Sequence, residues 1–86
     1  MEFDIWRNQI LQNPQDVSPL KFGMSQEEVI EIFGKPDAVS TMRSDGKPLI
    51  FKYHDIELHF GGKSHHGLHL IYSDDELELC ITAEHE

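Results

Sequence analysis

Leu20-Lys-Phe-Gly-Met-Ser-Gln-Glu-Glu-Val-Ile-Glu-Ile-Phe-Gly-Lys-Pro-Asp37 is the stretch that decides the fold, because it contains both the start and the end of a helix. Ser25 is placed to cap the first turn, and Glu28, three residues later, is placed to complete a capping box. Gly34 is expected to end the helix in the left-handed conformation, and Pro36 prevents its continuation. One side of the helix is apolar and the other is acidic. The apolar side consists of Val29, Ile30, Ile32 and Phe33, and the acidic side of Glu27, Glu28 and Glu31. The segment predicts a helix with one buried face and one acidic face.

Residues 3–12 predict a second, short helix at the start of the chain. Phe3, Trp6, Ile10 and Leu11 fall within about 140° of arc when successive residues are about 100° apart, so they form one apolar side. Asn13 is expected to end this helix, because Pro14 after it disfavours the helical conformation.

From residue 38 onward, apolar and polar residues alternate between short turn segments, which predicts half-buried strands. The residues predicted to face the core are Leu49, Phe51, Tyr53, Ile56, Leu58, Phe60, Leu68, Leu70, Tyr72, Leu77, Leu79 and Ile81. Consecutive strands joined by short turns form an antiparallel meander. Its predicted core pairs across neighbouring strands are Tyr53–Ile56, Phe51–Leu58, Phe60–Leu68, Leu58–Leu70, Tyr72–Leu77 and Leu70–Leu79. We therefore expect one α+β domain over residues 1–86, in which two N-terminal helices cover one face of a four- to five-stranded antiparallel sheet.

Composition limits the class of partner and the compartment. With 7 basic and 16 acidic residues the net charge is -9, which repels DNA, RNA and anionic membranes and favours a basic protein as partner. Cys80 is the single cysteine, so an internal disulfide is excluded, in agreement with a reducing compartment. The acidic N-terminal residues do not resemble a secretory signal, and no stretch approaches the roughly 18 apolar residues of a membrane span. We expect a cytoplasmic protein.

The predicted register places His59 opposite His69, and His69 opposite Cys80, on the sheet face turned away from the helices. Opposed Cβ atoms in neighbouring strands are about 4.5 to 5.5 Å apart, so two imidazoles and a thiolate could share a zinc or copper ion. His65 and His66, in the loop between the third and fourth strands, are candidates to join this metal-binding or pH-responsive site. The simpler interpretation is a polar row of an exposed sheet without a ligand.

The same free face mixes apolar, polar and charged residues, as protein-binding surfaces do. Its predicted contact residues are Thr41, Ile50, Lys52, Glu57, His59, His69 and Ile71. Phosphate-binding glycine loops, nucleophile elbows and paired catalytic carboxylates are absent from the sequence, so we expect neither enzymatic activity nor a required cofactor. We therefore expect a non-enzymatic protein-binding module. A homodimer joined through sheet edges or faces is a third interpretation.

Residues 20–72 resemble the small repeat of the outer-membrane assembly lipoproteins of the SmpA/OmlA (BamE) group and of the β-lactamase inhibitory proteins. The shared features are Gly-Met-Ser at residues 23–25, a valine-containing helix, Gly-x-Pro at residues 34–36 and the strand meander. The resemblance implies two helices on one side of an antiparallel sheet whose free face binds proteins. The chain differs from these proteins in two ways. The β-lactamase inhibitors carry two copies of the unit and this chain holds one, and the lipoproteins carry an anchoring cysteine near the N-terminus whereas Cys80 lies in the last predicted strand. Size, charge and this fold together suggest an inhibitor or immunity protein for a toxin such as a nuclease.

Overall fold

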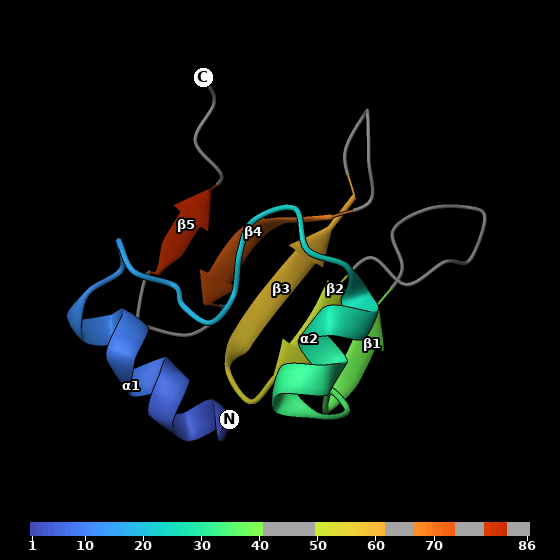
Figure 1. The fold of residues 1–86 in the computed structure, drawn as a ribbon, viewed down its shortest axis with the longest axis horizontal. Coiled ribbons are helices and arrows are strands. Elements are labelled where there is room, and N and C mark those ends of the chain that lie inside the picture. The colour runs from blue at the N-terminus through green and yellow to red at the C-terminus, as the bar shows by residue number, and fades with distance from the viewer. Residues whose placement is uncertain (41–49, 62–66, 74–78, 83–86) are drawn as a thin grey trace.

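The structure is a computed structural model that describes residues 1–40, 50–61, 67–73 and 79–82. Its elements, in chain order, are α1 (Phe3–Gln12), α2 (Gln26–Phe33), β1 (Ala38–Ser40), β2 (Ile50–Tyr53), β3 (Ile56–Phe60), β4 (Leu68–Ser73) and β5 (Cys80–Thr82). The strands form one antiparallel sheet in the order β1-β2-β3-β4-β5 (Figure 1). The predicted α+β class, both helices and the meander are thus confirmed. Within the described residues, neither helix has the length and apolar character that a membrane span needs.

Helix α2 is bounded by local sequence at both ends. The Ser25 hydroxyl accepts a hydrogen bond from the Glu28 backbone N–H at 3.1 Å, and the Glu28 carboxylate accepts one from the Ser25 backbone N–H at 2.8 Å. These bonds are the predicted capping box. Gly34 follows with φ 85° and ψ -166°, which is not the predicted left-handed form but another conformation that is nearly restricted to glycine.

One cluster of buried side chains contains residues from both helices and from the sheet. Trp6 and Ile10 of α1 and Val29 of α2 are completely buried in it. The Phe33 ring of α2 contacts the rings of Trp6 and Tyr53, with centroids 5.1 Å and 5.7 Å apart. The sheet contributes Phe51, Tyr53, Ile56, Leu58, Phe60, Leu68 and Ile71, and Leu79 joins them from the residue before β5. Ile30 was predicted to be buried and is instead 40% exposed. It lies about 100° around the helix from the buried Val29, whereas Ile32 and Phe33 pack against the cluster.

Polar bonds join each helix to the sheet. Arg7 of α1 donates to both carboxylate oxygens of Asp55, at 2.8 Å and 2.6 Å, and Asp55 lies in the turn between β2 and β3. At the end of α2, the Gly34 carbonyl oxygen accepts a hydrogen bond from the Tyr53 hydroxyl at 2.7 Å. Burial and the nearby Asp37 carboxylate raise the pKa of Tyr53 to about 12. The hydroxyl therefore stays protonated and keeps donating at neutral pH.

Gly67, just before β4, lies where two backbone segments nearly touch. The Gly23 N–H donates to the Leu68 carbonyl oxygen at 2.7 Å, and the Leu68 N–H donates to the Met24 carbonyl oxygen at 2.9 Å. A Cβ atom on Gly67 would overlap the backbone of Gly23. The segment that leads into α2 is therefore bound to the start of β4, and this contact requires a residue without a side chain.

The Arg7–Asp55 ion pair is predicted to make stability depend on pH. The hydrogen bond from Arg7 holds the pKa of Asp55 below its ordinary value of 3.8. Because the folded-state pKa is the lower one, the pair stabilises the fold fully above the unfolded-state value, and this contribution is lost as the pH falls through the folded-state value. We expect Arg7→Met to lower the free energy of unfolding at neutral pH by about 1 to 3 kcal/mol. When the pH is lowered, the variant should lose less additional stability than the wild type does.

Urea denaturation at neutral pH and near pH 3 measures both effects. Lys21→Met is the matched control, because it removes one positive charge from an exposed position. An Arg7→Met chain with the same acid sensitivity as the wild type would show that Asp55 is not stabilised by this pair.

The contact at Gly67 is predicted to exclude every larger residue. We expect Gly67→Ala to lower the free energy of unfolding by about 1 to 3 kcal/mol, because one of the two backbone segments must move to admit the methyl group. Ser40→Ala, at an exposed position of β1, is expected to change it by less than about 0.5 kcal/mol. Chemical denaturation compares the two variants, and equal stabilities would refute the close approach.

Candidate binding face of the sheet

Strand pairing assigns each side chain of the sheet to one of two faces, because directly opposed residues of neighbouring strands share a face. One face contributes to the buried cluster. We call the other the mixed face, and its described residues form two rows across all five strands. The first row is Ala38, Lys52, Glu57, Tyr72 and Cys80, and the second is Ser40, Ile50, His59, Leu70 and Thr82.

A β-bulge at His69 determines which residues of β4 reach the mixed face. Phe60 is opposite Leu68, whereas its neighbour His59 is opposite Leu70, so His69 is an extra residue in β4. An extra residue offsets the alternation of all side chains that follow it in the strand. The predicted pairs on the other side of β3 are unaffected, and Tyr53–Ile56 and Phe51–Leu58 are confirmed, as is Phe60–Leu68.

The bulge overturns three predicted positions in β4. Leu70 and Tyr72 were predicted to face the core but lie on the mixed face, where Tyr72 is 41% exposed. Ile71 was predicted to be a contact residue but is completely buried, opposite Leu58 and Ile81. The predicted pairs of Leu70 with Leu58 and with Leu79 are therefore wrong. The sequence held one sign that the faces of β4 could be exchanged: residues 70–72 are all apolar, so either alternating set of side chains could face the core.

The bulge also separates the predicted metal ligands. His59 is opposite Leu70 and Cys80 is opposite Tyr72, so the predicted row of His59, His69 and Cys80 does not form. Among the described residues, no three His, Cys, Asp or Glu side chains are grouped so that they could hold a metal ion. Three candidates lie outside the described residues, and their roles stay predictions: Thr41, His65 and His66.

Instead, His59 contacts two other side chains of the mixed face. Its Nε2 atom lies 3.0 Å from Oε1 of Glu57, two residues earlier in β3. Its ring meets the Tyr72 ring edge-on, with centroids 6.3 Å apart. Glu57 and Tyr72 are themselves directly opposed on β3 and β4. These contacts bring the three side chains together as one group on the mixed face.

Aliphatic residues surround this group. Ile50 and Leu70, both half-buried, are the residues opposite His59 on the two neighbouring strands. Lys52, also half-buried, is opposite Glu57 on β2. The centre of the mixed face therefore combines an aromatic ring, two aliphatic side chains and one pair of opposite charges. Aromatic residues such as tyrosine are enriched on surfaces that become buried against another protein.

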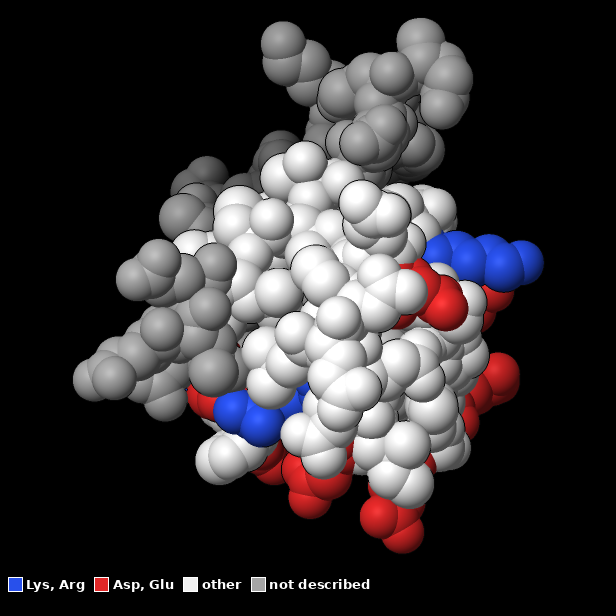
Figure 2. Space-filling model, turned by 90° about the vertical axis from the view of Figure 1, so that its left-hand side faces the viewer, with Lys and Arg blue, Asp and Glu red and all other residues white. Residues whose placement is uncertain are grey.

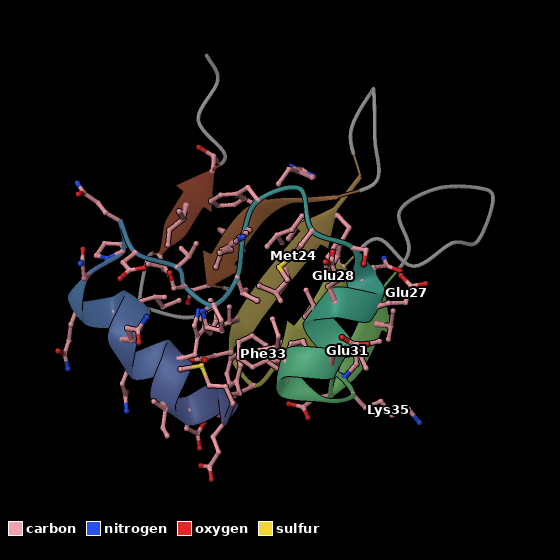
Figure 3. The ribbon with its side chains drawn as sticks, in the orientation of Figure 1. Met24, Glu27, Glu28, Glu31, Phe33 and Lys35 are labelled. Atoms are coloured by element: carbon pink, nitrogen blue, oxygen red, sulfur yellow. The ribbon has the colours of Figure 1, made fainter. Side chains whose placement is uncertain are left out.

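Most of the described acidic residues lie away from this face. Lys52 and Glu57 are its two charged members among the described residues. The acidic residues elsewhere are Glu2, Asp4, Asp16, Glu27, Glu28, Glu31, Asp37 and Asp55. Figure 3 shows Glu27, Glu28 and Glu31 on α2, and Figure 2 shows a largely uncharged side of the molecule with acidic residues along its lower and right-hand rim. Among the residues that the structure describes, most of the negative charge thus lies outside the mixed face.

Comparison with models of protein families, with curated proteins and with solved structures found no match for this chain. The resemblance of residues 20–72 to the SmpA/OmlA and β-lactamase inhibitory repeat therefore stays a prediction. The surface chemistry of the mixed face remains the basis for assigning a role.

The observed register predicts which engineered cysteine reaches Cys80. Tyr72 and Cys80 are directly opposed, and opposed Cα atoms in antiparallel strands are about 4.5 to 5.5 Å apart, within the range of a disulfide. We expect Tyr72→Cys to form an intrachain disulfide under mild oxidation, whereas His69→Cys does not. Mass spectrometry after alkylation of free thiols in dilute protein detects the bond. If the His69→Cys chain formed a disulfide and the Tyr72→Cys chain did not, the observed register would be contradicted and the predicted register without a bulge would be supported.

Proposed function

We propose that this chain is a non-enzymatic protein-binding module and that the mixed face is its contact surface. The observation that carries the proposal is the bulge at His69, after which Leu70 and Tyr72 lie on that face. Bulges commonly re-aim side chains at functional sites, and exposed tyrosines often supply much of the binding energy of an interface. In this proposal the chain has no catalytic residue and needs no cofactor.

In this proposal, both helices cover the opposite face of the sheet. Trp6, Ile10 and Val29 share one buried cluster with the inward-facing residues of the strands, which supports that arrangement. In Figure 1, α2 is drawn in front of the strands, whereas α1 lies to the lower left of β3 and β4. The helices then give the sheet a rigid support and leave the mixed face for a partner.

The net charge of -9 favours a basic protein among the possible partners. Because the described acidic residues are concentrated outside the mixed face, we expect the charge to speed the encounter more than to add direct contacts. Electrostatic steering of this kind weakens as salt screens the charges. An inhibitor or immunity protein for a basic toxin, such as a nuclease, is the most concrete form of the proposal.

Site-specific photo-crosslinking in the native host tests the contact surface. A photoreactive phenylalanine analogue replaces Tyr72, and the same analogue replaces Ile5 as a control, since Ile5 is 57% exposed on α1. We expect a covalent protein adduct from the Tyr72 position and none from the Ile5 position. Mass spectrometry identifies the captured protein.

Equal adducts from both positions, or none from Tyr72, would rule out the mixed face as the contact surface. If the captured protein is not this chain itself, its association rate with the wild-type chain is then measured at low and high salt. A rate that does not fall with salt would refute the electrostatic part of the proposal while leaving the surface assignment intact.

A further inference from the structure

We infer that the mixed face binds a second copy of this chain. The inference rests on the proposed function, since it names the protein that occupies the same surface. Two copies with a net charge of -9 each repel one another, so they associate only where charge is locally balanced and apolar surface is available. The described part of the mixed face meets both conditions.

Its charge is balanced by one cation and one anion. Lys52 and Glu57 are directly opposed on β2 and β3, and both are half-buried. The other described residues of the face have no formal charge when histidine is neutral: Ala38, Ser40, Ile50, His59, Leu70, Tyr72, Cys80 and Thr82. With histidine counted as neutral, the described residues of two copies that meet here bring no net charge into the interface.

Two-fold symmetry turns this pair into contacts between the copies. If the axis runs along the strands between β2 and β3, Lys52 of each copy faces Glu57 of the other. The same axis sets Tyr72 of one copy against Ala38 of the other, so that a large side chain meets a small one. Sheets packed face to face lie about 10 Å apart, which leaves room for one layer of side chains from each copy.

The symmetry also keeps the acidic surfaces apart. With the helices on the opposite face, as proposed above, α1 and α2 of both copies lie on the two outer sides of the dimer. Glu27, Glu28 and Glu31 of the two copies are then far from one another, and their mutual repulsion is small. The outer acidic surfaces can still attract a basic partner, which must displace the second copy to reach the mixed face.

The dimer is expected to be weak. Five strands about 4.8 Å apart span roughly 24 Å, and the paired segments are short, so the face is smaller than the roughly 800 Å² per partner of a standard interface. Association should therefore depend strongly on protein concentration.

Charge-reversal variants of Lys52 and Glu57 test the inference. Sedimentation equilibrium measures the self-association of each chain over about a hundredfold range of concentration. We expect wild-type chains to self-associate, and Lys52→Glu and Glu57→Lys each to weaken association at least about tenfold, because like charges then face across the axis. An equimolar mixture of these two variants is expected to restore it, since every new charge meets its complement. Lys21→Glu and Glu27→Lys, outside the mixed face, are the matched controls and should associate like the wild type.

A wild-type chain that remains monomeric at every concentration overturns the inference, whatever the variants do. Single variants that dissociate and stay dissociated when mixed overturn the two-fold arrangement, provided that circular dichroism shows both to be folded. If the wild type is monomeric while the Tyr72 photo-crosslink captures a different protein, the second-copy inference fails and the proposed function stands. If the Tyr72 position captures no protein and the wild type is monomeric, both fail.

Discussion

Successive side chains of a strand point to opposite faces, so one extra residue in β4 changes what both faces of the sheet contain beyond it. The bulge at His69 buries Ile71 completely and leaves Leu70 and Tyr72 on the mixed face. The same offset separates His69 from both His59 and Cys80. One backbone irregularity thereby places Leu70 and Tyr72 on the proposed contact surface and breaks the row of His59, His69 and Cys80 on which the predicted metal site depends.

The residues just before the bulge are held by the segment that starts α2. Both backbone polar groups of Leu68 bond to Gly23 and Met24, and Gly67 beside it has no space for a side chain. The start of β4 is thus held by the chain leading into the capped helix, while the strand beyond the bulge pairs with β5. A local signal for a helix and a long-range contact with a strand therefore share the same few residues.

Most of the described negative charge and the proposed contact surface lie on different parts of the molecule. The helices carry many of the described carboxylates, whereas the mixed face holds one opposed pair of charges, Lys52 and Glu57, among uncharged side chains. This separation allows long-range attraction of a basic protein and short-range contact through a neutral surface within one small domain. It also favours the mixed face as the place where two acidic copies meet, because the rest of the described surface is predominantly negative.

The sequence by itself determined the elements of this protein, since caps and short turns depend on neighbouring residues: Ser25 and Glu28 begin α2, and the turn after Tyr53 sets the β2–β3 pairs. Residues 70–72 are all apolar, so either Ile71 or the pair Leu70 and Tyr72 could face the core. The local pattern does not decide between these two arrangements. Only the tertiary structure decided that Ile71 is buried. The physical reason is that a bulge arises from the pairing of whole strands, which no local periodicity encodes.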